Sequence, residues 1–204
     1  MTYGEKFFRK SIDYKPLFKL LAKEYGAEKA KYIRQSAGNE LDGIISRFPD
    51  MSEGERQHTD KFIFPRIALY HVLQAEAVDR ALKYIEDTVT IQGKRMGKLL
   101  KGISSLPAME WVFLKIFSSM AESMFGESGG FRQTFYDSPK GIVKFDITDC
   151  IYCRYCRLCG CPELIHSFCI TDNYCFGSLS KIKFTRIETL ETGNKCDFTL
   201  SIEK

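Results

Sequence analysis

Hydrophobic residues recur every three or four positions along the first ~125 residues, which is the spacing of an amphipathic helix. The pattern predicts one helix over residues 12–25, ended by Gly26. It predicts a second over residues 27–47, with Pro49 just past its end. The first quarter of the chain is therefore expected to be helical, with clear stop signals.

A long helix is predicted to begin near Pro65, with one apolar face made by Leu69, Val72, Leu73, Ala77 and Ala81. In the next segment, Ile91–Ile103, two glycines weaken a helix without excluding it. A further helix is expected to open at Pro107 and close at Gly126. Its apolar stripe is Trp111, Leu114, Phe117, Ala121 and Met124. We interpret these stripes as surfaces for helix packing.

The period of the pattern then changes to two. Phe131–Tyr136 and Gly141–Thr148 are predicted strands, and residues 143–148 alternate between apolar and polar as a half-buried strand does. Residues 150–176 are predicted to be helical, with a break near Gly160–Pro162.

A hairpin is predicted to end the chain. Its strands are Lys181–Leu190 and Lys195–Ile202, and its turn is the segment between them, which contains Gly193. Apolar side chains share one face of the last strand: Cys196, Phe198, Leu200 and Ile202.

This order of elements predicts a single α+β domain over residues 1–204. N-terminal helices would pack with a C-terminal antiparallel sheet of about four strands and intervening helices. Within this domain, residues 1–127 form the helical part. Residues 128–204 form a cysteine-rich strand–helix–strand part that contains the motifs.

Composition narrows the class of protein. The net charge of +4 is spread, with +1 in residues 150–204 and +3 in the rest, so we expect no nucleic-acid partner. No segment approaches the ~20 apolar residues that span a bilayer, and residues 1–6 lack a signal-peptide apolar region. We therefore expect a cytoplasmic protein with no membrane contact. The oligomeric state stays open, with a homo-oligomer as one option.

All eight cysteines lie after residue 149. Five follow a spacing that invites an iron–sulfur interpretation: Cys150-x-x-Cys153-x-x-Cys156-x-x-Cys159-x-Cys161-Pro162. A ferredoxin-type loop needs three residues before its last cysteine, whereas this chain has one, and the intervening residues are bulky. On a helix, each three-residue step turns the thiol by about 60°, so four cysteines cannot all meet one metal. We therefore expect no metal and no cofactor. The alternative is a zinc site or an iron–sulfur cluster that uses some of these thiols. Cys175 is a further extra thiol.

Three motifs carry a family resemblance: Asp146-Ile147-Thr148-Asp149-Cys150, then Cys169-Ile170-Thr171-Asp172, then Phe184-Thr185-Arg186-Ile187-Glu188-Thr189-Leu190 with Gly193 and Cys196-Asp197-Phe198. Together they resemble the L-2-amino-thiazoline-4-carboxylic acid hydrolase family. A weaker likeness is to ligand-sensing domains of the 4-vinyl reductase type, some of which bind zinc. Thr189 stands where such a domain would have another cysteine.

The resemblance implies a small substrate with a carboxylate and a cyclic amidine-like carbon, whose C–N bond is opened by hydrolysis. Cys169, Asp172 and Cys150 are the candidate catalytic residues. Arg186, Thr189 and His166 are the candidate substrate-binding residues, in the roles of carboxylate ligand, hydroxyl donor and nearest group able to lower the pKa of Cys169. Whether a thiol or an activated water attacks is left open.

Two other functions fit the same residues. A non-catalytic module could bind a small molecule in a pocket without consuming it, and a metal protein could use the extra thiols. Several of these residues also have a structural interpretation: Cys169 and Cys196 as buried hydrophobes, Asp172 as a helix cap, Arg186 as a cross-strand ion-pair partner, and His166 as a surface or helix-packing residue.

Overall fold

The computed structural model describes residues 1–76 and 78–203. The chain folds into two compact units. The first comprises residues 1–51 and 56–89, and the second comprises residues 52–55 and 90–204. The prediction of a single domain stays a prediction.

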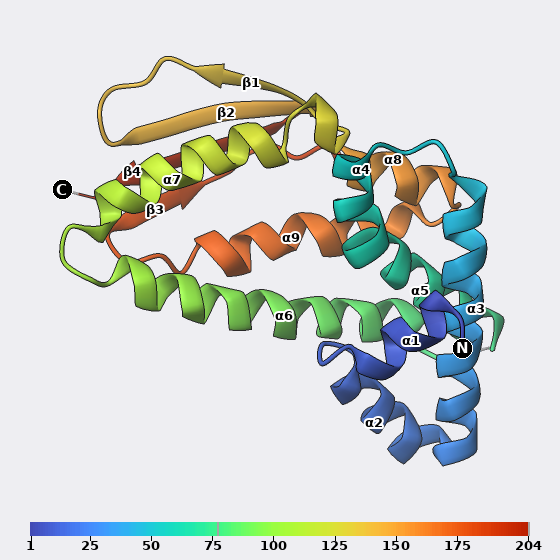
Figure 1. Ribbon diagram of the computed structural model, residues 1–204. Coiled ribbons are helices and arrows are strands. Elements are labelled where there is room, and N and C mark those ends of the chain that lie inside the picture. Colours follow the sequence, from blue (N-terminus) through green and yellow to red (C-terminus); the bar gives the residue numbers. More distant parts are fainter. Residues whose placement is uncertain (77, 204) are drawn as a thin grey trace. The chain divides into compact units, whose positions relative to one another are not determined.

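The first unit is helical and centres on α3 (Ala27–Arg47), which packs against α1 (Tyr3–Lys10), α2 (Lys15–Tyr25) and α5 (Phe64–Ala75) (Figure 1). The predicted helices over residues 12–25 and 27–47 are confirmed. The backbones of α1 and α3 lie unusually close together, because a Cβ on Gly4 would lie 2.0 Å from the Gly38 carbonyl oxygen. Buried aliphatic side chains of α3 and α5 fill the space between them, including Ile33, Leu41, Ile67 and Leu73.

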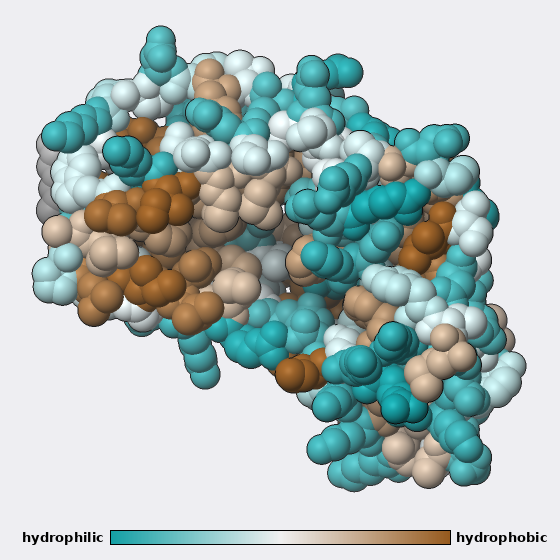
Figure 2. Space-filling model, viewed as in Figure 1, coloured by the Kyte–Doolittle hydropathy of each residue, from teal (hydrophilic) through white to brown (hydrophobic). Residues whose placement is uncertain are grey.

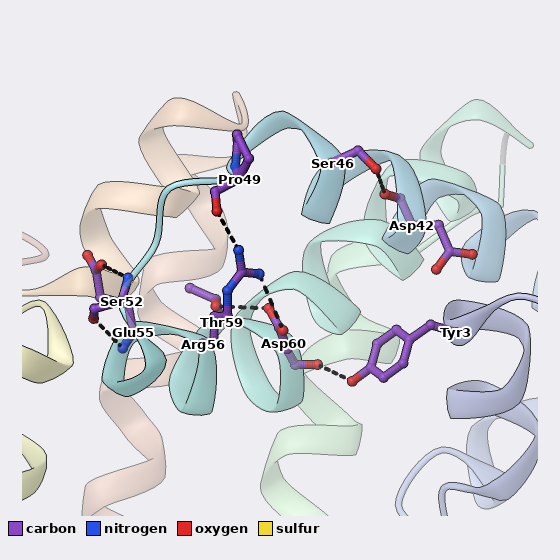
Figure 3. Close-up of polar contacts among 9 residues, drawn as sticks. All are labelled: Tyr3, Asp42, Ser46, Pro49, Ser52, Glu55, Arg56, Thr59 and Asp60. Atoms are coloured by element: carbon purple, nitrogen blue, oxygen red, sulfur yellow. Dashed lines mark hydrogen bonds and ion pairs between the residues drawn. The ribbon is translucent and has the colours of Figure 1, made fainter.

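Residues 48–63 connect α3 to α5 through α4 (Glu53–His58) and the π-helix η1 (Thr59–Ile63). Ser52 and Glu55 form a capping box at the start of α4: the Glu55 N–H donates to the Ser52 hydroxyl at 3.1 Å, and the Ser52 N–H donates to the Glu55 carboxylate at 2.9 Å (Figure 3). In the same view, the Arg56 guanidinium donates to the Pro49 carbonyl at 2.6 Å. These local bonds define where α4 begins.

The prediction of one long helix from Pro65 through Ala81 is wrong. Helix α5 ends at Ala75 and a new helix, α6, runs over Ala81–Ser104; Ala77 lies outside the described residues. The reason is tertiary packing: the Val78 side chain is buried, its N–H donates to the Leu73 carbonyl, and Arg80 takes a left-handed backbone conformation. Nothing in the helix propensity of this stretch signals such a break.

Ile91–Ile103 is helical as predicted, as part of α6. Its glycines allow a close approach to α9 (Ile165–Phe176), because a Cβ on Gly93 would lie 2.9 Å from the Tyr174 Cβ and one on Gly97 only 2.2 Å from the Tyr174 carbonyl oxygen. In the sequence pattern these glycines are only weak points of a helix. In the fold they are contact points that position α9, the helix that carries Cys169.

The second unit contains a four-stranded antiparallel sheet in the order β1-β2-β4-β3. Its strands are β1 (Arg132–Tyr136), β2 (Ile142–Asp149), β3 (Ile182–Thr185) and β4 (Cys196–Ile202). Helices α7 (Met109–Met124) and α8 (Ile151–Leu158) and the 3-10 turns η2 (Glu127–Gly129) and η3 (Pro162–Leu164) complete the unit with α9. The predicted α+β class with a C-terminal sheet is confirmed.

Aromatic rings form the core between the sheet and its helices. The cross-strand partners Phe145 and Phe198 stack with centroids 4.8 Å apart. The Phe117 ring of α7 contacts the rings of Phe145 on β2 and Phe176 on α9, with ring centroids 6.3 and 5.3 Å apart. Figure 1 shows α7 running along the sheet. The alternation predicted for the last strand is confirmed, since Cys196, Phe198 and Leu200 are buried.

Helix α7 is not simply amphipathic, because it has apolar side chains on its exposed side as well as on its buried side. Leu114, Phe117 and Ala121 of the predicted stripe are buried, whereas its two ends, Trp111 and Met124, are exposed. Several large apolar side chains on the other side are also exposed: Val112, Ile116 and Met120. Figure 2 shows brown hydrophobic atoms gathered over α7 and the C-terminal half of α6.

The strand predicted over Lys181–Leu190 is half the expected length, because β3 ends at Thr185. Residues 186–195 instead form an irregular connection. An Asp197 carboxylate oxygen accepts the N–H groups of Ile187 and Glu188, at 2.9 and 2.6 Å, which removes them from strand pairing. This connection carries Arg186 and Leu190 of the candidate site.

Candidate functional site

Four elements of the second unit bring the predicted site residues together. Cys150 follows β2 and is the N-cap of α8, while Cys169 and Asp172 lie one turn apart on α9. Arg186 begins the connection after β3. Because Ile147 of β2 pairs with Cys196 of β4, Cys150 and Cys196 lie at the same end of two adjacent strands.

A buried ion pair anchors the site. Arg186 donates from Nη1 to the Asp172 carboxylate at 2.6 Å and from Nη2 to the Cys169 carbonyl oxygen at 2.6 Å. Its guanidinium also lies 5.4 Å from the centre of the Phe198 ring. The Arg186 side chain is only 4% exposed, whereas that of Asp172 is 29% exposed, so Asp172 is the more accessible member of the pair.

The electrostatics of Asp172 are set by two opposing effects. Burial raises the pKa of its carboxyl to about 6, and the charge and hydrogen bond of Arg186 act in the opposite direction. A carboxyl with such a pKa is largely ionised at neutral pH and can still accept and release a proton there.

The thiols around it are poor acids. Burial is the main cause that raises the pKa of Cys169 to about 12 and that of Cys196 to about 11. The hydrogen bond with the Cys153 side chain is the main cause that raises the pKa of Cys150 well above its ordinary value, and burial is the second cause. Hydrogen bonds from the backbone N–H groups of Tyr152 and Cys153 lower this pKa, but they do not outweigh the first two effects. All three thiols are therefore protonated at neutral pH.

A cleft of about 270 Å³ opens beside the cluster. Its lining comes from the end of β2, from α8 and from the 186–195 connection: Thr148, Asp149, Cys150, Cys153, Arg154, Arg157, Leu158 and Leu190. Among the described residues, Cys150 is the predicted catalytic residue that lines it. Cys150 is among the groups that raise the pKa of both Cys169 and Cys196, which places the thiol that lines the cleft near the other two.

The two remaining predicted residues make contacts elsewhere. His166 is exposed on α9, and its Nδ1 lies 3.0 Å from a Glu191 carboxylate oxygen. The Thr189 carbonyl accepts the Gly193 N–H at 2.8 Å and thereby shapes the connection. Their described contacts do not include Cys169 or Asp172, and their predicted roles stay predictions.

The middle of the cysteine run, with Cys153 and Cys156, lies in helix α8, whereas Cys150 and Cys159 cap that helix and Cys161 follows it. Cys153, Cys156 and Cys161 are buried, and the contact between the thiols of Cys156 and Cys161 raises the pKa of Cys156 far above its ordinary value. Among the described residues, no group of three or more His, Cys, Asp or Glu side chains is arranged to hold a metal ion.

Two residues of the cleft, Arg157 and Leu190, were not predicted from the sequence. Arg157 stands out there only as a bulky interruption of a cysteine run. Its spacing contains a signal nevertheless: Cys150, Cys153 and Arg157 follow an i, i+3, i+7 pattern, which places them on one side of a helix. Leu190 belongs to the third family motif, but nothing in the sequence indicates that it lines a cleft, because the irregular connection that carries it has the sequence pattern of a strand.

The fold and the site together define an α+β protein with a carboxylate–guanidinium pair and a set of neutral thiols beside a small cleft. The family model described as L-2-amino-thiazoline-4-carboxylic acid hydrolase matches residues 56–200, which is most of the chain. The chain therefore belongs to this family, as its motifs predicted.

Similarity to other known proteins is low. No curated protein matches the chain. Among solved structures, the Fe(II) unliganded H-NOX protein from K. algicida has a TM-score of 0.35 and 10% identity, over 95% of this chain and 96% of that one. A point mutant of the same protein has the same TM-score and coverage with 11% identity. Likeness at this level carries no argument about function.

No helix among the described residues has the length and apolar character needed to cross a membrane.

Proposed function

We propose that this protein is a hydrolase that opens a cyclic, amidine-like C–N bond in a small carboxylate substrate of the L-2-amino-thiazoline-4-carboxylate type. Membership of the L-2-amino-thiazoline-4-carboxylic acid hydrolase family supports this reaction class. The observation that supports the assignment in this chain is the Asp172–Arg186 pair, in which a partly accessible carboxylate is held beside two thiols.

Asp172 is the proposed general base. Its carboxylate takes a proton from a water molecule as the water oxygen bonds to the amidinium carbon of the substrate. The ring C–N bond then breaks, and the proton returns to the departing ring nitrogen. The sum is the addition of one water molecule, with no oxidant, reductant or metal in the sequence of steps.

The neutral thiols favour this water route over direct attack by sulfur. With a pKa of about 12, Cys169 supplies very little thiolate at neutral pH. We propose that Cys169 instead borders the reacting centre as a neutral group, and that Cys150 forms the wall where the substrate enters. Arg186 holds Asp172 in position, since both of its terminal nitrogens are already engaged.

The experiment is to incubate the purified protein with L-2-amino-thiazoline-4-carboxylate and to follow the ring-opened product by mass spectrometry. The variants are Cys169→Ala and, as a matched control on the same helix, Cys175→Ala. A water route predicts that Cys169→Ala keeps measurable turnover, reduced by about tenfold at most. Complete loss in Cys169→Ala, with Cys175→Ala active, would instead make the thiol the nucleophile. Binding of the compound without product would favour a sensor.

A further inference from the structure

The cleft beside Cys150 contains two arginines whose charges are balanced differently. Arg154 lies 2.8 Å from the Asp149 carboxylate and 3.5 Å from that of Glu55, and it also donates to the Gly130 carbonyl at 3.1 Å. Its positive charge is therefore neutralised within the protein. No ligand is needed to explain its position.

Arg157 differs, because no carboxylate among the described residues pairs with it. Its described contact is a 3.2 Å hydrogen bond from Nη2 to the Leu190 carbonyl. Arg157 lines the cleft, and this bond leaves the other donors of its guanidinium available. An exposed arginine fixed by one backbone contact is a ready partner for an anion, because its planar fork matches a carboxylate.

The rest of the lining suits the remainder of a small molecule. Leu158 and Leu190 offer apolar surface, and Leu158 is 62% exposed. The Cys150 thiol is a soft, polarizable neighbour for a sulfur-containing ring. A cleft of about 270 Å³ is large enough for a small carboxylate compound.

We propose that this cleft binds a small carboxylate, with Arg157 as the residue that binds its carboxylate group and thereby places the rest of the molecule against Cys150. The identity of that carboxylate as the hydrolase substrate rests on the proposed function; the anion site itself does not.

This inference reassigns the carboxylate-binding role that the sequence favoured for Arg186. The Arg186 side chain is 4% exposed and neutralised by Asp172, so a substrate carboxylate would have to displace Asp172 to reach it. Arg157 needs no such displacement. It also lies on the face of α8 that carries Cys150 and Cys153.

The test uses two alkylating reagents of similar size, iodoacetate, which is an anion, and iodoacetamide, which is neutral. The rate of modification of Cys150 by each is measured on the native protein by peptide mass spectrometry. The ratio of the two rates cancels changes in thiol pKa or accessibility. The variants are Arg157→Gln, Arg157→Lys, and Lys183→Gln, which removes one positive charge from β3 outside the cleft lining.

We expect the iodoacetate-to-iodoacetamide ratio at Cys150 to fall by roughly fivefold in Arg157→Gln, and to stay within about twofold of wild type in Arg157→Lys and Lys183→Gln. The reactions are run at about pH 9, because the raised pKa of Cys150 leaves little thiolate at neutral pH. An unchanged ratio in Arg157→Gln overturns the inference, and so does a Cys150 that neither reagent reaches in the folded protein even at this pH. If Arg157→Gln does not fold, Arg157→Met, which also removes the charge, takes its place, and an unchanged ratio in that variant overturns the inference as well.

Turnover separates this inference from the proposed function. If the protein hydrolyses the substrate, Arg157→Gln should raise KM by roughly tenfold with little change in kcat. If the protein shows no hydrolase activity but the reagent ratio falls as expected, the anion site is supported and the proposed reaction is refuted. If the protein hydrolyses the substrate but Arg157→Gln changes neither the reagent ratio nor KM, the proposed reaction is supported and the anion site is refuted.

Discussion

Replacing Arg186 by methionine should destabilise the protein in a pH-dependent way. The substitution keeps an apolar stem of similar length against Phe198, and it removes the hydrogen bonds to the Asp172 carboxylate and the Cys169 carbonyl. Asp172 would then be an ionised, partly buried carboxylate without its partner. The damage is therefore concentrated on one titratable group.

The size of the effect follows from the contacts. Loss of a charge-assisted hydrogen bond and exposure of an unpaired carboxylate should cost about 3 kcal/mol at about pH 8, which is the lower end for a buried pair because Asp172 is 29% exposed. At about pH 5 the carboxyl can be protonated in the variant, and the cost should fall to about 1–2 kcal/mol.

The direction of the pH dependence is fixed by the raised pKa of Asp172. Native protein binds this proton more tightly than the unfolded chain, so the carboxyl's favourable contribution is complete below its ordinary pKa of 3.8 and is lost as the pH rises through about 6. Removing Arg186 removes the group that lowers this pKa. In the Arg186→Met variant the pKa of Asp172 is therefore higher still, and the stability lost as the pH rises through that pKa is larger.

Urea unfolding of wild type and Arg186→Met at about pH 5 and about pH 8 measures both free energies of unfolding. Asp172→Asn in the Arg186→Met background is the control, since it removes the titrating group and should remove the excess loss at high pH. An equal destabilisation at both pH values would show that Arg186 acts only through packing, and the electrostatic reasoning would be wrong.

Three further predictions concern the frame of the site and its chemistry. Gly97→Ala should destabilise by about 2 kcal/mol, because its Cβ would lie 2.2 Å from a backbone oxygen of α9, whereas Gly102→Ala on the same helix meets nothing within 4 Å and should stabilise slightly; thermal unfolding of both checks this. Asp197→Ala should speed amide hydrogen exchange in the 186–195 connection and reduce stability by about 1–2 kcal/mol, and unchanged exchange would remove its organising role. If Asp172 is the base, kcat/KM should rise with pH through about 6, because the carboxylate must be ionised to accept the proton; a flat profile would contradict this.

Much of the fold could be predicted because its boundaries have chemical signals. Gly26 and Pro49 mark the two ends of α3, and the switch to period-two alternation marks β2. The break after Ala75 could not be predicted, because it depends on where the Val78 side chain is buried. The same holds for the end of β3, which depends on capture of two N–H groups by Asp197, a residue on another strand.

The candidate site was predictable in its members but not in their pairing. The family motifs identify Cys150, Cys169, Asp172 and Arg186 from the sequence. That Arg186 is held by Asp172, instead of being available to a ligand, depends on how α9 lies beside the 186–195 connection. The cleft is likewise a product of tertiary structure, because its lining joins α8 to Leu190, which is far from that helix in sequence.

The most direct test of the central claim is the rate of ring opening of L-2-amino-thiazoline-4-carboxylate by wild-type protein and by Asp172→Asn. Asparagine keeps the size of the side chain and a hydrogen-bond acceptor for Arg186, so a folded variant isolates the role of the carboxylate. We predict a ring-opened product from the wild type and a rate at least about 100-fold lower in the variant. A folded wild type that forms no product, or a variant as active as the wild type, would contradict the assignment of Asp172 as the base of a hydrolase.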